Sequence, residues 1–161
     1  MIKLIVCTDI NGGIGYENKL LFNIKEDLKF FKQMTNGHKI VMGYNTWMSL
    51  PKKPLPNRDH YILTSRNTIM ESEDVHVIRS VEDIIELGKT EDIFVIGGAQ
   101  LYREMIYKNL VDEVYLTLVK EAAENVDAHI DLFDINKSLH HREFIKSIDN
   151  DSAHIYKYSK R

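Results

Sequence analysis

Asp27 lies on the apolar side of a segment whose hydrophobic periodicity predicts a helix over residues 24–35. At about 100° per residue, that side comprises Ile24, Leu28, Phe31, Met34 and Thr35, whereas Lys, Glu and Gln side chains fill the other. Withdrawal from water favours the neutral form of a carboxyl, and a cationic ligand with paired N–H donors favours the ionised form. Asp27 is therefore suited to grip an amidine-like edge of a heterocycle and to assist a proton transfer. The simpler alternative is an acid of the first helical turn that interacts with the helix dipole.

Two glycine-containing junctions join predicted strands to predicted helices. Residues 93–96 run into Gly97-Gly98 before a helical pattern, and residues 40–42 run into Gly43 before Tyr44-Asn45-Thr46-Trp47. Glycines at such junctions let backbone N–H groups approach a phosphate. Two junctions on one parallel sheet can address both ends of a dinucleotide, although each alone is also typical of an ordinary tight turn.

A long segment without regular periodicity covers residues 11–23 and ends just before the helix that carries Asp27. Long loops in compact domains often serve as lids or binding loops, although an ordinary connection is the simpler interpretation. Arg58, after a proline-rich loop over residues 51–57, and Arg66 lie where a carboxylate or phosphate could be recognised.

Composition and missing motifs exclude several classes of protein. The formal net charge of −3 does not provide the basic surface that nucleic acid requires, and no apolar run approaches the roughly 20 residues of a membrane span. The chain has no HExxH pair, no Cys/His ligand cluster and no GxSxG turn, so metal and nucleophilic catalysis lose support. The one cysteine, Cys7, fits a reducing compartment, and we expect a cytoplasmic protein. Of the classes of catalysis considered, these observations leave chemistry that is supplied by a bound redox cofactor.

Short Val- and Ile-rich runs alternate with helical patterns, which predicts an α/β fold with a parallel sheet. The expected strands cover residues 2–7, 39–42, 61–64, 75–78 and 93–96, and the expected helices cover 24–35, 81–88 and 98–107, with a short one after Gly43. Asn23 and Glu26 predict a capping box for the first helix. Residues 113–119, 142–148 and 154–158 predict further strands, the last two forming an antiparallel hairpin at the sheet edge. We expect one domain over residues 1–161.

Six segments, taken in this order, resemble the dihydrofolate reductase family, and together they are far more specific than any one of them. They are Ile14-Gly15-Tyr16-Glu17-Asn18; Asp27-Leu28 with Phe30-Phe31-Lys32 and Thr35; Met42-Gly43 with Thr46-Trp47 and Ser49-Leu50; Pro54-Leu55-Pro56-Asn57-Arg58; Val95-Ile96-Gly97-Gly98-Ala99-Gln100-Leu101-Tyr102; and Tyr115-Leu116-Thr117. The resemblance implies an eight-stranded, mostly parallel sheet with an antiparallel C-terminal strand, flanked by about four helices. It also implies reduction of 7,8-dihydrofolate by NADPH in a monomer that binds antifolate-type inhibitors.

The resemblance assigns a role to each candidate site residue. Asp27 would hold the 2-amino and N3 edge of the pterin and support protonation at N5, and Arg58 would bind the α-carboxylate of the glutamate tail. The rest of the substrate site would comprise Ile5, Cys7, Leu28, Phe31, Leu50 and Thr117. The cofactor site would comprise Ile14, Gly15, Asn18, Leu20, Gly43, Tyr44, Asn45, Thr46, Thr64, Ser65, Arg66, Ile96, Gly97, Gly98, Ala99, Gln100, Leu101 and Tyr102, with Ser65 and Arg66 near the 2'-phosphate.

Three positions depart from the family pattern. Leu21-Phe22 stands where the family usually has Pro-Trp, so an indole N–H donor is missing from the loop. Tyr44 stands where many members have a basic residue beside the cofactor phosphates. Asp127-Ala128-His129-Ile130 replaces the usual Asp-Thr and aromatic-Pro run.

Two alternatives belong to other functional classes. The reductase of riboflavin synthesis shares the fold and cofactor, but its usual zinc deaminase partner signature is absent and Arg58 argues for a substrate with a glutamate tail. A folate- or nucleotide-binding module without turnover is the non-enzymatic alternative. Binding without NADPH oxidation would select it.

Overall fold

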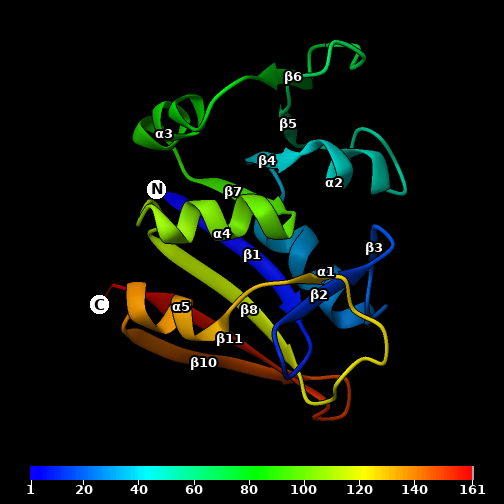
Figure 1. The fold of residues 1–161 in the computed structure, drawn as a ribbon, viewed down its shortest axis with the longest axis vertical. Coiled ribbons are helices and arrows are strands. Elements are labelled where there is room, and N and C mark those ends of the chain that lie inside the picture. Colours follow the sequence, from blue (N-terminus) through cyan, green and yellow to red (C-terminus); the bar gives the residue numbers. More distant parts are fainter. Residues whose placement is uncertain (161) are drawn as a thin grey trace.

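Val- and Ile-rich strands form the centre of the computed structural model, which describes residues 1–160 (Figure 1). The main sheet has eight strands in the order β10-β11-β8-β1-β7-β4-β5-β6. Their bounds are β1 (Ile2–Thr8), β4 (Lys39–Gly43), β5 (Asp59–Leu63), β6 (Val75–Ile78), β7 (Ile93–Gly97), β8 (Glu113–Val119), β10 (His141–Ile148) and β11 (Ala153–Ser159). The predicted α/β class and strand set are confirmed, with most strands longer than expected by one or two residues, and with β5 beginning two residues earlier than expected and ending before Thr64.

The C-terminal hairpin of the main sheet follows the predicted arrangement. β11 runs antiparallel to both β8 and β10, whereas the other neighbouring pairs are parallel. The connecting turn contains Asp149, Asn150 and Asp151, all with positive φ, a conformation that Asn and Asp tolerate better than most residues. β10 forms the sheet edge, and a bulge interrupts its pairing between Phe144 and Lys146.

Five helices within residues 1–160 pack on the two faces of the sheet, one more than the four predicted. They are α1 (Lys25–Thr35), α2 (Tyr44–Ser49), α3 (Val81–Thr90), α4 (Ala99–Tyr107) and α5 (Leu132–Ser138). α5 has only seven residues, too few for its periodicity to stand out, and it begins where the side chain of Asp131 accepts a hydrogen bond from the backbone N–H of Phe133.

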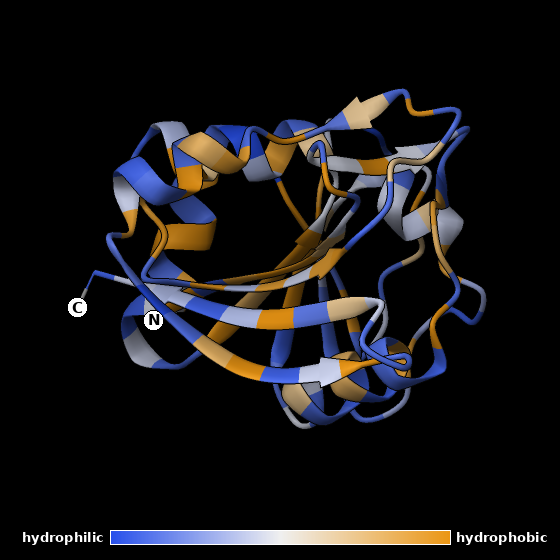
Figure 2. Cartoon of the chain, turned by 90° about the horizontal axis from the view of Figure 1, so that it is seen from below, coloured by the Kyte–Doolittle hydropathy of each residue, from blue (hydrophilic) through white to orange (hydrophobic). Residues whose placement is uncertain are grey.

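Alternation along β1 divides the hydrophobic core into two layers. Leu4 and Val6 pack in one cluster with residues of α3, α4 and α5, whereas Ile5 packs in the other with residues of α1 and α2. Figure 2 shows the hydrophobic residues on the strands and on the helix sides that face them. Asp27 belongs to α1 and therefore lies on the Ile5 side of the sheet.

The start and the buried face of α1 differ from the prediction. Ile24, not Asn23, is the N-cap, and it makes no side-chain cap, so the expected capping box is wrong. The capping box of this chain belongs to α3, between Ser80 and Asp83. Phe30 is buried against Tyr115, whereas Leu28 is 44% exposed. The helix packs on the sheet through Phe30 and leaves Leu28 at its open side.

A second, three-stranded sheet orders the segment that was expected to be irregular. β2 (Gly13–Tyr16) pairs with both β3 (Lys19–Leu20) and β9 (Ala128–His129). Figure 1 shows β2 and β3 beside the long connection that follows β8. We call residues 10–22 the lid. Among residues 1–160, no helix is long and apolar enough to cross a membrane.

Candidate active site

Asp27 projects from α1 onto the carboxyl ends of two central strands. The hydroxyl of Thr117, on β8, donates a hydrogen bond to Oδ1 of Asp27 over 2.5 Å. The thiol of Cys7, on β1, also donates to this carboxylate. Cys7 and Thr117 are register partners on neighbouring strands, so the parallel pairing of β1 with β8 places both donors beneath one carboxylate.

Burial sets the protonation of this group of residues. It raises the pKa of Asp27 above its ordinary value, against the lowering effect of the Thr117 and Cys7 donors. Burial and the neighbouring Asp27 raise the pKa of the Cys7 thiol as well, so Cys7 remains a protonated donor at neutral pH. Below them, the hydroxyl of Tyr102 donates to the carbonyl of Ile5 over 2.7 Å. Asp27 is thus a half-buried carboxyl that retains a proton more readily than a surface aspartate.

Apolar side chains surround the carboxylate on the same side of the sheet. Ile5, Phe31, Leu50 and Ile96 belong to one hydrophobic cluster, and Phe22 from the end of the lid packs against it. Such a site, apolar around one carboxyl, suits a flat heterocycle that carries N–H donors on one edge.

The two glycine junctions meet, as the sequence predicts for neighbouring parallel strands. Gly97 lies opposite Met42 in the β4–β7 register. A Cβ at Gly97, whose φ is +145°, would lie 2.9 Å from Oγ1 of Thr46, which follows the other junction. At Gly43, a Cβ would meet no atom within 4 Å. The junctions are therefore in tight contact at Gly97, whereas the space beside Gly43 is open. This shape leaves backbone N–H groups free to bind a phosphate.

The loop that follows β5 carries an arginine stacked on an aromatic ring. The guanidinium of Arg66 lies over the ring of Tyr44 at 4.3 Å from its centroid, a cation–π geometry. Arg79, at the end of β6, donates through Nη1 to the carbonyls of Thr64 (2.7 Å) and Arg66 (2.9 Å) and through Nη2 to Asn67 (3.0 Å). Sequence reasoning missed Arg79, because an arginine after a strand usually lies free in solvent.

Arg58, which the sequence predicts to bind a carboxylate, is buried, with 6% of its surface exposed. Its Nε donates to the carbonyl of Pro56 over 2.8 Å, and its Nη1 donates to Oγ1 of Thr35 over 3.2 Å. Burial lowers the pKa of Arg58. Thr35, at the C-terminal end of α1, therefore fixes the direction of the guanidinium, a role that the sequence pattern did not reveal.

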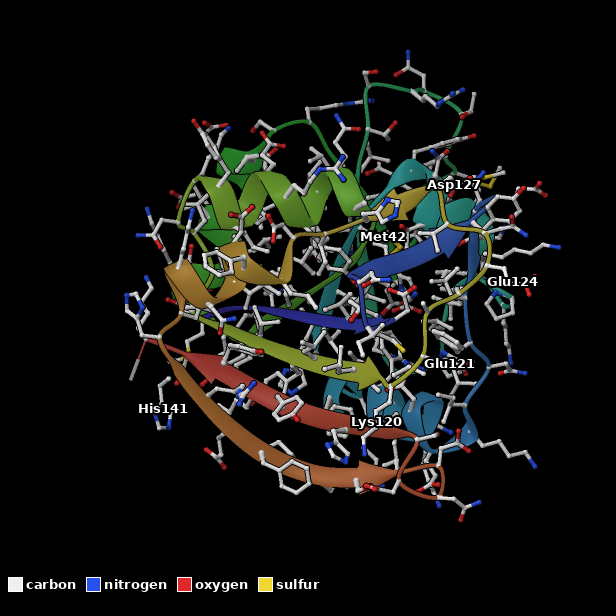
Figure 3. All side chains as sticks on the ribbon, turned by 60° about the horizontal axis from the view of Figure 1, so that its bottom comes forward. Met42, Lys120, Glu121, Glu124, Asp127 and His141 are labelled. Carbon is white, nitrogen blue, oxygen red and sulfur yellow. The ribbon has the colours of Figure 1, made fainter. Side chains whose placement is uncertain are left out.

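The lid is held by the segment that follows β8. The backbone N–H of Glu17 donates to Oδ2 of Asp127 over 3.0 Å, and the N–H of Asp127 donates to the carbonyl of Gly15 over 3.0 Å. Figure 3 shows Asp127 beside β2. The departure from the family pattern over residues 127–130 therefore preserves a paired strand, β9, next to β2.

The structure brings part of the predicted site residues together in three groups. Those around Asp27 come together, as do Gly43, Thr46 and Gly97, and Tyr44 with Arg66. Leu101 and Tyr102 are buried in the core, so only their backbone is free to meet a ligand. Asn18, Leu20, Asn45, Ser65 and Gln100 are exposed.

Fold and site together define an α/β protein with a nucleotide-type site at the carboxyl edge of a parallel sheet and one carboxyl at its floor. Comparison with known proteins is more specific. Residues 1–161 match the dihydrofolate reductase family, and the chain belongs to that family.

Named relatives and a solved structure agree with this membership. The chain is 40% identical over 121 residues to a dihydrofolate reductase of Ureaplasma parvum serovar 3, covering 75% of this chain and 76% of the relative. It is 41% identical over 119 residues to one of Staphylococcus aureus strain Mu50, covering 74% and 71%. The dihydrofolate reductase of Enterococcus faecalis, solved with NADP(H) and RAB-propyl, superposes with a TM-score of 0.80 at 30% identity, over 99% of this chain and 95% of that one.

Proposed function

We propose that this chain reduces 7,8-dihydrofolate to 5,6,7,8-tetrahydrofolate with NADPH. The observation that carries the proposal is the half-buried Asp27 carboxyl, held by Thr117 and Cys7 at the floor of an apolar site. Family membership supports the reaction, and the Enterococcus faecalis neighbour, solved with NADP(H), supports the cofactor.

Asp27 would act on the substrate in two ways. Its carboxylate would accept hydrogen bonds from the 2-amino and N3 groups of the pterin, which fix the ring in the site. It would also support protonation at N5 through a water molecule, because burial raises its pKa and lets it hold a proton more readily than a surface aspartate. Protonation at N5 makes C6 a better hydride acceptor, since a cationic iminium attracts hydride more strongly than a neutral imine.

The residues at the junctions fit the cofactor. NADPH, when bound, supplies the hydride for C6 of the pterin. The open space at Gly43 and the backbone from Gly97 to Tyr102 would receive its phosphates, and Arg66, stacked on Tyr44, would meet the 2'-phosphate. The lid residues Ile14, Gly15, Asn18 and Leu20 would cover the nicotinamide and exclude water from the reacting atoms.

The remaining parts of the proposal concern the substrate tail and the assembly. Arg58, directed by Thr35, would pair with the α-carboxylate of the glutamate tail. Antifolate-type inhibitors would occupy the pterin site through the same Asp27 contacts. We also propose that the protein acts as a single-domain monomer.

The decisive experiment follows the absorbance of NADPH with and without dihydrofolate. Oxidation that requires dihydrofolate and yields tetrahydrofolate supports the proposal. Tight binding of both ligands without oxidation would identify a binding module instead. A phosphorylated pyrimidine substrate in place of dihydrofolate tests the riboflavin-type reductase.

A further inference from the structure

Asp9 is a buried carboxylate at the root of the lid, outside the group of residues around Asp27. It follows directly after β1, and only 2% of its surface is exposed. A charged side chain in such a position requires partners for both of its oxygens, because an unpaired buried charge is costly.

The two oxygens of Asp9 bind two different segments. Oδ1 accepts the backbone N–H groups of Asn11 (2.9 Å) and Gly13 (2.8 Å), which belong to the lid. Oδ2 accepts the N–H of Ala123 (3.0 Å), in the connection between β8 and β9. One carboxylate thus links the lid to that connection. Burial tends to raise the pKa of Asp9, but the three N–H donors hold it below its ordinary value, so the carboxylate stays ionised at neutral pH.

Close packing surrounds this link. A Cβ at Gly13 would lie 3.1 Å from the Asp9 carboxyl and 2.9 Å from Cγ1 of Val126. Gly12, with φ of +85°, lies against the carbonyl of Ile130, and its own carbonyl accepts the Ile130 N–H over 2.9 Å. The root of the lid therefore has little freedom to move without displacing residues 121–130.

The tip of the lid contrasts with this root. Glu17 and Asn18 are exposed in a turn, and the carboxylate that meets the tip, Asp127, is itself exposed. A hydrogen bond in contact with water is more readily exchanged than one that is buried. The root thus fixes where β2 lies, while the tip can change its contacts.

We propose that Asp9 is a positioning residue for coenzyme binding, which fixes the root of the lid to the β8–β9 connection and so holds Ile14 and Gly15 against the bound coenzyme. This inference rests on the proposed function, because it takes the coenzyme to lie under the lid. Loosening the link should let the coenzyme leave faster while the Asp27 contacts stay intact.

Asp9→Asn tests the link at a single atom. The amide retains one acceptor oxygen and replaces the other with a donor, so it can satisfy the lid or Ala123 but not both. The matched control is Asp112→Asn, because Oδ2 of Asp112 also accepts a backbone N–H, that of Ile2 at 2.8 Å, at the opposite end of β1. We expect both variants to be less stable, but only Asp9→Asn to release NADPH about tenfold faster in stopped-flow displacement.

Hydrogen exchange without ligands separates this inference from the proposed function. In Asp9→Asn, amides of residues 10–16 and 121–130 should exchange faster, whereas Asp112→Asn should leave them unchanged. Equal NADPH release in the two variants, or unchanged exchange in Asp9→Asn, would overturn the inference. Failure of the wild-type protein to bind NADPH would refute the proposed function, whatever the exchange shows. If Asp9→Asn does not fold, Ala123→Pro removes the donor to Oδ2 and tests the same bond from the other side.

Discussion

The amino and carboxyl ends of the central parallel strands differ in whether their charged side chains form ion pairs. At the amino ends, Lys3 lies 3.3 Å from both Asp92 and Glu113, and Lys157 lies 3.3 Å from the other oxygen of Glu113. The charges there neutralise one another within the protein. Glu113 is buried, and a buried carboxylate without an opposite charge would destabilise the protein. Its pairing with Lys3 and Lys157 is therefore needed for stability.

At the carboxyl ends, charges remain without an opposite charge. Within residues 1–160, neither the half-buried Asp27 nor the exposed Arg66 forms a salt bridge. Neutral groups hold them instead: Thr117 for Asp27 and the ring of Tyr44 for Arg66. The comparison teaches that one end of the sheet neutralises its charges within the protein, whereas the other leaves them without an opposite charge, and the proposed function assigns these to ligands.

Asp27→Asn should produce the largest effect. We expect turnover near neutral pH to fall by roughly 10²- to 10⁴-fold, because the amide keeps the shape of the side chain but cannot carry the proton. Steady-state oxidation of NADPH with dihydrofolate measures the loss. Glu26→Gln is the matched control one residue away; Glu26 is exposed and accepts the N–H of Asp149 over 2.8 Å, so it should leave turnover unchanged.

The pH profile sharpens the same test. In the wild-type protein, the raised pKa of Asp27 keeps a fraction of this carboxyl protonated at a higher pH than is usual for an aspartate. Turnover should therefore fall as the pH rises through the pKa of Asp27. In Asp27→Asn the residual activity should rise toward low pH, where solvent protonates the substrate. A variant with wild-type turnover at neutral pH would remove Asp27 from the chemistry.

Arg58→Leu should have the next largest effect. Loss of a forked pair with the α-carboxylate should raise KM for dihydrofolate by about 10- to 100-fold. Affinity for an inhibitor that lacks the glutamate tail should change little, and this inhibitor serves as the control within one variant. Equal losses for both ligands would show that Arg58, which is buried against Thr35, acts through the position of its loop.

Arg66→Ala should change coenzyme preference by a smaller amount. A charge-assisted hydrogen bond contributes about 1.5 to 3 kcal/mol, so NADPH should bind roughly one to two decades more weakly, while NADH stays almost unchanged. Added salt should narrow the wild-type preference, because Arg66 is exposed. Binding titrations with both coenzymes measure this, and parallel weakening of the two would assign Arg66 a structural role.

Glu113→Gln should leave turnover unchanged, because Glu113 lies at the amino ends of the strands. Its removal should lower the free energy of unfolding by about 1 to 3 kcal/mol, since Lys3 and Lys157 lose a buried partner. Urea unfolding beside Glu104→Gln, whose exposed pair with Lys108 should contribute less than about 1 kcal/mol, provides the scale. A change in turnover with unchanged stability would contradict the division of charge between the two ends.

Asp27 could be found from the sequence because it breaks the pattern of its own helix. The strands of the main sheet could also be predicted from the sequence, because buried parallel strands consist of continuous Val- and Ile-rich runs. Gly97 and Gly43 stood out for the same local reason: each follows such a run directly.

Residues whose role arises from tertiary contacts could not be found in this way. In the sequence, Asp9 resembles an ordinary acid of a turn, and its role depends on the N–H of the distant Ala123. Arg79 resembles a solvated arginine, and its role depends on its hydrogen bond to the carbonyl of Thr64. β2 and β9 contain only four and two residues, and their pairing joins Gly13 to His129. Sequence periodicity carries no signal for pairing over such a distance.

The place of β1 in the sheet has a consequence for how the chain folds. β1 precedes the other strands of the main sheet in the sequence, yet it lies between β7 and β8, with Ile2 opposite Ile93 and Lys3 opposite Glu113. During synthesis, β1 therefore has neither neighbour until β7 and β8 have left the ribosome. Contacts so distant in sequence slow folding, because a long loop must close before any of them forms.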